Sequence, residues 1–362
     1  MKVSRLSLSP SNSRGRVSQR RVHTRHEGMK VNRGLGLGWL IGGLSVAVGC
    51  STAGSLDGPA ARPSAALAAP ASTPIPKTAK ASVTAPASAA PRVEPPIPAP
   101  AYDLGADIEV RRRQAIDDLG PRTDVQLVET TFVVAAPGGR GSLASAVDVT
   151  RHALEAYFNG RFSKRPERAI SVYLFPNAGP YEAYCKKHDS APCISPFGYY
   201  EHGDRHIIMN VGPGIGTLTH ELIHPLVETD FPKAPDWINE GIASLFEHFY
   251  FSAPGEIHGG KNWRHPRLVQ ALRSEKERHY SSVPSIFALS DEEFRGERED
   301  LNYASARFLC QWLDQKHLLW PFYQRWRDNY ADDPSGSKSF EAVVGKTLAE
   351  ADTEWSTWVL RL

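Results

Sequence analysis

The spacing of apolar residues changes along the chain and predicts where its strands and helices lie. Runs rich in Val, Ile, Thr and aromatic residues predict strands at residues 125–135, 169–175 and 205–211. Apolar residues three and four apart predict helices at 107–119, 142–157 and 181–188. Beyond residue 240 the pattern is helical, at 264–279, 291–294, 303–315, 320–329 and 348–360. This order predicts an α+β fold, with an N-terminal mixed β-sheet and a mainly α-helical C-terminal lobe.

Two short segments in the middle of the chain carry metal-binding residue types. The first is a His-Glu-Leu-Ile-His pentapeptide, and the second, at 237–243, is Trp-Ile-Asn-Glu-Gly-Ile-Ala. Positions four apart share one helix face, so His220 and His224 can bind one metal ion, and Glu221 can reach a water molecule that the metal activates. Glu240 supplies a third ligand. Two histidines and one carboxylate leave a fourth position open, which is typical of a catalytic zinc site.

These segments resemble the gluzincin branch of the zincin metallopeptidases, the peptidase MA clan. Residues 237–243 are especially similar to the third-ligand helix of the aminopeptidase N family. The resemblance implies that the two histidines and Glu240 bind one zinc ion, with Glu221 as the general base. The chain has no Gly-x-Met-Glu-Asn segment, which in that family holds the substrate's free amino end. It therefore resembles the smaller peptidase MA-like domains, with a zincin-like fold, and an endopeptidase is favoured over an aminopeptidase.

Two further residues are candidates for supporting roles. Tyr303 opens the predicted helix 303–315, and aminopeptidase N relatives place a tyrosine similarly, where its neutral hydroxyl stabilises the tetrahedral oxyanion. The alternative is a core tyrosine on an amphipathic helix. Glu247, seven residues beyond Glu240, is a candidate to orient a zinc ligand from behind. The alternative is a solvated surface residue.

Two expectations concern the backbone near the histidines. Pro225 directly follows His224, and proline removes an N–H and clashes with the carbonyl four residues back. A kink or a helix end is therefore expected at Pro225. In zincins the strand before the zinc helix is an edge that pairs with the substrate backbone, and by analogy residues 206–211 take this role.

The front of the chain predicts export from the cytoplasm. A charged start at 29–33 and an apolar run at 34–49 resemble a bacterial signal sequence, too short to span a membrane. Residues 47–50, Ala-Val-Gly-Cys, resemble a lipobox with alanine where leucine is usual, so Cys50 is the expected lipid attachment site. A soluble secreted protein and an uncleaved anchor are the alternatives. Because the signal begins at Met29, translation is expected to start there.

Composition and charge divide the chain further. Residues 1–49 form the leader, and 50–101, rich in Ala and Pro, predict a disordered linker. Residues 102–362 are the expected zincin-like metallopeptidase domain, with lobes at about 122–230 and 231–362. The leader holds nine Lys or Arg and one acid, a balance of +8, whereas the whole chain is +2, so the remainder carries −6. No nucleic-acid partner is therefore expected.

Cysteines are few, and each has an expected state. Cys185 and Cys193 are close in sequence within a loop region, and in an oxidising exterior they are expected to form a local disulfide. Cys310 lies on the apolar side of the predicted helix 303–315 and is expected to be a buried packing residue. The Cys and His spacings do not resemble a structural zinc knuckle.

Together these features favour a lipid-anchored zinc metallopeptidase of the bacterial cell envelope that acts on peptides or proteins. Two alternatives stay open: a catalytically inactive zincin-fold module that binds an envelope partner, and a zinc hydrolase whose substrate is not a peptide. The presence of all three ligands and the base favours activity.

Overall fold

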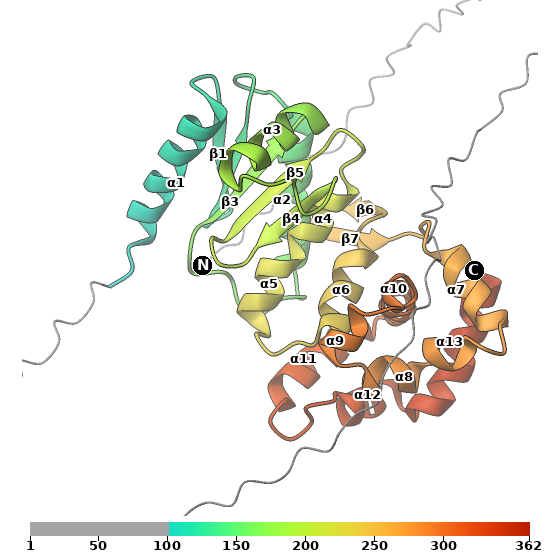
Figure 1. Ribbon diagram of the computed structural model, residues 1–362. Coiled ribbons are helices and arrows are strands. Elements are labelled where there is room, and N and C mark those ends of the chain that lie inside the picture. The colour runs from blue at the N-terminus through green and yellow to red at the C-terminus, as the bar shows by residue number, and fades with distance from the viewer. Residues whose placement is uncertain (1–100) are drawn as a thin grey trace, which may run out of the picture. The chain divides into compact units, whose positions relative to one another are not determined.

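The computed structural model describes residues 101–362. The expected start at Met29, the signal sequence, Cys50 and all but the last residue of the linker lie outside the described residues. Among the helices described, none is long and apolar enough to cross a membrane. The fold is α+β: a five-stranded mixed sheet comes first, and a mainly helical region follows it (Figure 1).

The sheet has the strand order β1-β2-β3-β5-β4. Its strands are β1 (Asp124–Val128), β2 (Phe132–Ala136), β3 (Ile170–Phe175), β4 (Gly198–Glu201) and β5 (His206–Asn210). β2, β3 and β5 run parallel, whereas β1 and β4 are antiparallel to their neighbours and form the two edges. β3 is buried along its whole length, which explains why Ser171 is the one small polar residue in an otherwise apolar strand.

Two expectations about these strands are wrong. Residues 125–135 form a hairpin of two strands, because Glu129 adopts a left-handed conformation (φ 52°) and turns the chain between β1 and β2. Residues 206–211 are not an edge, because β5 lies between β3 and β4. The edge strand on this side of the sheet is β4, which the sequence did not predict. It has only four residues, too few to show an alternation of apolar and polar positions.

Helices cover both faces of the sheet. Successive residues of a strand point to opposite faces, and two separate cores result. On one face α1 (Leu104–Leu119) and α3 (Ala178–His188) cover a small core that includes Tyr173 and Ile208. The opposite face packs against α2 (Ala144–Phe158) and joins the main core, which continues into the helical region.

The histidine motif lies on an interrupted helix. α4 (Gly216–Glu221) and α5 (Ile223–Asp230) are separated at Leu222, which nevertheless keeps helical angles (φ −64°, ψ −23°). The expected break at Pro225 is thus displaced by one turn. Pro225 lies in the first turn of α5, where a missing N–H needs no partner inside the helix. Both histidines therefore stay on helical backbone.

The region after the motif is not entirely helical, contrary to expectation. α6 (Asp236–Leu245) is followed by a hairpin of β6 (Phe249–Ala253) and β7 (Glu256–Gly259). The remaining elements are α7 (His265–Arg273), the 3₁₀ helix η1 (Arg278–Ser281), α8 (Val283–Ala288), α9 (Asp291–Phe294), α10 (Glu299–Gln315), α11 (Leu319–Asn329), α12 (Ser337–Val344) and α13 (Leu348–Arg361). The helices predicted at 291–294, 303–315, 320–329 and 348–360 are confirmed. The one predicted at 264–279 ends early, and α8 and α12 were not predicted.

Close packing fixes α6 against the helical region. A Cβ on Gly241 would lie 2.8 Å from the Sγ of Cys310 and 3.1 Å from the carbonyl oxygen of Ala306, both on α10, so the approach requires glycine. Cys310 is buried, as expected. Near the start of α6, the buried Trp237 stacks on Trp326 of α11 with ring centroids 5.5 Å apart. These contacts hold α6 in place, and with it Glu240, the residue before Gly241.

A disulfide fixes the chain that leads into the edge strand. Cys185, on α3, and Cys193, in the following loop, are joined with their sulfur atoms 2.03 Å apart. The Tyr181 hydroxyl also donates to the carbonyl oxygen of Ser195 at 2.6 Å. These contacts hold the loop just before β4.

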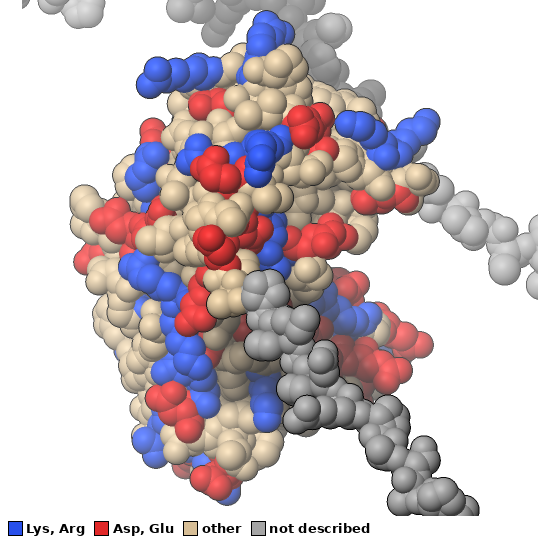
Figure 2. Space-filling model, turned by 90° about the vertical axis from the view of Figure 1, so that its left-hand side faces the viewer, with Lys and Arg blue, Asp and Glu red and all other residues tan. Residues whose placement is uncertain are grey.

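The described surface carries charges of both signs. On the face that lies to the left in Figure 1, Lys and Arg side chains alternate with Asp and Glu side chains (Figure 2). Neighbouring opposite charges cancel one another beyond short distances. The part of this face that is drawn in colour therefore presents a mixed field.

Candidate metal centre

The structure brings the three predicted ligands together. His220 on α4, His224 on α5 and Glu240 on α6 are all buried, and their ligand atoms lie within 4.8 Å of one another. The Nε2 of His220 lies 3.3 Å from the Oε2 of Glu240, and the Nε2 of His224 lies 4.0 Å from its Oε1. Three side chains from three helices thus converge on one point.

The electrostatics of this cluster fit a bound cation. Oε2 of Glu240 is buried and has no hydrogen-bond partner within residues 101–362, a costly state that a metal ion would relieve. Burial disfavours charge on His220, but Glu240 and Glu247 outweigh this effect and raise the pKa of His220 to about 10. Burial also opposes charge on Glu240, yet the two histidines and Arg295 hold its pKa well below its usual range. The cluster is therefore built to hold positive charge, and its donor set suits a divalent metal.

Each histidine has a partner behind its ring. The Nδ1 of His224 forms a hydrogen bond of 3.1 Å with the Oδ1 of Asn239. The Nδ1 of His220 lies 3.5 Å from the Oε1 of Glu247, an ion-pair distance that is too long for a hydrogen bond within the described residues. Acceptors in these positions favour the tautomer with hydrogen on Nδ1 and leave Nε2 for a metal. The side chain of Glu247 is only 8% exposed, so the alternative of a solvated surface residue is wrong. The sequence pattern does not predict this role for Asn239, although it stands directly before Glu240.

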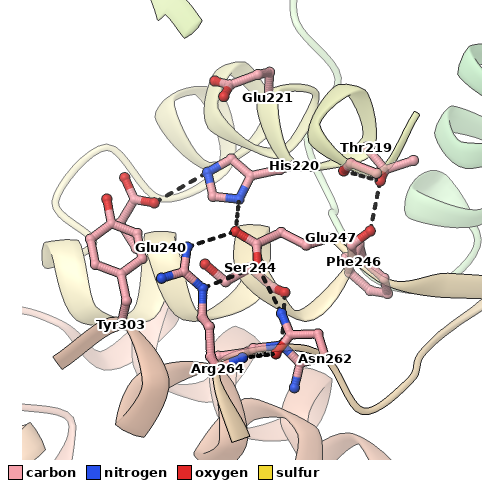
Figure 3. Close-up of polar contacts among 12 residues, drawn as sticks. Thr219, His220, Glu221, Glu240, Ser244, Phe246, Glu247, Asn262, Arg264 and Tyr303 are labelled. Atoms are coloured by element: carbon pink, nitrogen blue, oxygen red, sulfur yellow. Dashed lines mark hydrogen bonds and ion pairs between the residues drawn. The ribbon is translucent and has the colours of Figure 1, made fainter. Parts of the chain in front are cut away.

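The carboxylate of Glu247 is held in turn by two residues that follow β7. Arg264 donates through Nε and Nη2 to the two carboxylate oxygens of Glu247 at 3.1 and 2.9 Å, and Asn262 donates to Oε2 at 2.8 Å. Burial opposes the charge on Glu247, but His220 and Arg264 keep its pKa below its usual range. Figure 3 shows this chain of contacts running from His220 to Arg264. No sequence pattern predicts this role for Arg264 or Asn262.

The two candidate reactive groups border the same cleft as the ligands. Glu221 is buried, with Oε2 3.6 Å from the Nε2 of His224. The hydroxyl oxygen of Tyr303, on α10, accepts a hydrogen bond of 2.6 Å from Nη1 of Arg295. Burial raises the pKa of Tyr303, so its hydroxyl keeps its proton and can donate. Tyr303 is therefore not a purely internal core residue.

The cleft has a volume of about 1000 Å³ and lies between the sheet and the helical region. Tyr199 and Tyr200 of the edge strand β4 line one side, and Arg264 and Arg295 line another. Edge strands present backbone groups that can pair with another chain. The metal cluster thus opens onto a space that is large enough for a short peptide.

Comparison with known proteins adds no family name. No family model matches the sequence, and no curated protein is detectably similar to it.

Proposed function

We propose that the protein is a zinc-dependent endopeptidase with a zincin-like fold, and that His220, His224 and Glu240 hold the ion. The observation that carries the proposal is the buried three-ligand cluster, with Glu221 beside it, at the base of an open cleft. Support also comes from the α+β architecture, in which an antiparallel edge strand borders the cleft. A zinc ion supplies a Lewis acid that polarises a carbonyl group and activates water near neutral pH.

Two side chains and one strand edge of the protein carry out the remaining steps. Glu221 takes a proton from the attacking water and later delivers it to the leaving amine. Tyr303 donates a hydrogen bond to the oxygen on which negative charge develops. A peptide substrate aligns by adding its backbone to the free edge of β4, in the manner of strand addition.

The setting of this reaction is the bacterial cell envelope, with the chain anchored through lipid on Cys50. The signal-like segment at 34–49 supports export. The disulfide between Cys185 and Cys193 also suits an oxidising compartment outside the cytoplasm.

The test is peptide-library cleavage by the purified full chain, measured as isolated, after removal of metal by a chelator, and after zinc is restored. Cleavage should stop and return with zinc. Glu221→Gln should keep zinc but lose about 10²–10⁴-fold in turnover, whereas Glu155→Gln, an exposed position on α2, should change neither. Zinc binding without cleavage of any peptide would contradict the peptidase proposal and favour a binding module or a hydrolase of another substrate.

A further inference from the structure

Arg295 contacts three functional parts of the cleft with one guanidinium group. It lies in the turn between α9 and α10. Its Nη2 donates to Oε1 of Glu240 at 2.7 Å, its Nη1 donates to the Tyr303 hydroxyl oxygen at 2.6 Å, and its Nε donates to Oδ2 of Asp236 at 2.7 Å. The planar arginine fork sets the angles among these partners, which a lysine ammonium cannot do.

The contact with Glu240 decides how that carboxylate faces the metal position. Oε1 is occupied by Arg295, whereas Oε2 is buried, has no hydrogen-bond partner in the described part of the chain, and lies 3.3 Å from the Nε2 of His220. A carboxylate oxygen that accepts from arginine has given up part of its electron density and one of its lone pairs, so the other oxygen is the stronger metal ligand. The side chain is thus prepared to bind through a single oxygen.

The position of Arg295 is itself well supported. Asp236, its third partner, is the first residue of α6, and the backbone N–H of Asp236 donates to Oδ1 of Asp291 at 2.8 Å. The backbone N–H of Arg295 donates to the Asp291 carbonyl oxygen at 3.1 Å. Asn302 closes the turn by donating to the carbonyl oxygen of Phe294 at 3.0 Å. The turn is therefore tied to both α6 and α10, although the side chain of Arg295 is 44% exposed.

We propose that Arg295 is a positioning residue that holds Glu240 as a one-oxygen ligand and fixes the hydroxyl of Tyr303 beside it. This inference rests on the proposed zinc peptidase function. A role in binding a carboxylate of the substrate is less well supported, because each of the three guanidinium nitrogens already donates to a protein oxygen. Arg295 links the ligand to the oxyanion donor, so its loss should disturb both.

The test compares Arg295→Gln and Arg295→Lys with Arg298→Gln in the full-length chain. Arg298 is three residues further on, lies 3.9 Å from the Tyr280 ring centroid, and is not among the described residues that line the cleft. Three quantities are measured: zinc affinity by competition with a chelator, the visible spectrum of the cobalt-substituted protein, and kcat and KM for peptides with free and amidated C-termini. Thermal unfolding midpoints show whether each variant is folded.

Arg295→Gln should weaken zinc binding about 10–100-fold, change the cobalt spectrum because Oε1 of Glu240 is released to the metal, and lower kcat more than KM. Arg295→Lys should show smaller changes in zinc affinity, cobalt spectrum and kcat than Arg295→Gln, because lysine keeps the positive charge but not the forked set of donors. Arg298→Gln should match wild type in all three measurements.

Wild-type zinc affinity and cobalt spectrum in folded Arg295→Gln would overturn the proposal. So would an effect limited to KM for peptides with a free C-terminus, which would make Arg295 a substrate-binding residue. Failure of the peptidase function is distinguishable: if wild type binds zinc but cleaves nothing, the affinity and spectral measurements still decide the role of Arg295. A wild-type chain that binds no zinc would overturn both proposals.

Discussion

The candidate metal ligands and the two arginines that support them come from different regions of the molecule. His220, His224 and Glu240 lie on the consecutive helices α4, α5 and α6. Asn239 on α6 and Glu247 just after it lie next to the histidines, whereas Arg295, which contacts Glu240, and Arg264, which contacts Glu247, come from the segment between β7 and α10. The first region fixes which atoms can bind a metal, and the second fixes how these atoms point.

This difference teaches what a short motif can and cannot specify. The spacing of the histidines is a property of one helix, so periodicity alone brings them together. The arginines belong to connections that tertiary packing brings to the centre, and part of that packing is the close approach of α6 to α10 at Gly241, where a side chain would not fit. Substitutions in the segment between β7 and α10 should therefore change the metal affinity and the turnover rate, whereas His220, His224 and Glu240 should still be able to bind a metal.

Among changes outside the three ligands and Glu221, the largest effect is expected for Tyr303→Phe. Loss of the hydroxyl removes a donor to the developing oxyanion, so kcat should fall about 100–1000-fold while zinc stoichiometry stays at the wild-type value. Steady-state peptide hydrolysis and metal analysis check this, with Tyr280→Phe, a partly exposed tyrosine, as the control. An unchanged kcat would make Tyr303 a packing residue after all.

A smaller effect is expected for Glu247→Gln. The carboxylate behind His220 is replaced by a neutral amide, so zinc affinity should fall about 10–100-fold. Competition with a chelator measures the change, and Glu341→Gln, an exposed position on α12, is the control. Equal affinities in the two variants would show that Glu247 does not tune the metal ligand.

The pH dependence of zinc binding is the next test. The pKa of His220 is raised to about 10, so the metal-free protein carries a proton there at pH 7 that zinc must displace. Zinc affinity should therefore rise about tenfold for each pH unit from 7 to 9. In the metal-free protein, the stability contributed by this raised pKa is complete below about 6.5 and is lost as pH rises toward 10. Zinc affinity that is independent of pH in this window would contradict the assignment.

The smallest effect on the metal centre is expected for the double change Cys185→Ser and Cys193→Ser. Opening this short loop should lower the free energy of unfolding by about 2–3 kcal/mol, because the unfolded chain gains freedom. Zinc stoichiometry should not change, since no ligand lies in the loop. Chemical denaturation and metal analysis measure the two quantities, and loss of zinc would show that the loop supports the centre.

Elements with a strong local pattern were predictable from the sequence. β3 is apolar except for Ser171, and the helical spacing of α10 is regular over most of its length. The α+β class and the convergence of His220, His224 and Glu240 followed from such patterns. Cys185 and Cys193 were predicted as a pair because they are close in sequence.

The remainder depends on contacts that no local pattern records. β4 is too short to alternate, and its place at the sheet edge is set by pairing with β5. The turn at Glu129 requires a backbone conformation that glutamate seldom adopts. Arg264 and Arg295 lie in connections between elements, where spacing carries no information about partners. Their roles became visible only with the atoms that they contact.

Zinc titration of the metal-free full chain tests the central claim most directly. One zinc ion should bind per wild-type chain and per Glu221→Gln chain, whereas His224→Ala should bind at least 1000-fold more weakly, as an order-of-magnitude expectation for a lost ligand. No zinc binding by the wild-type chain, or the same affinity in His224→Ala, would contradict the assignment of His220, His224 and Glu240 as a metal centre.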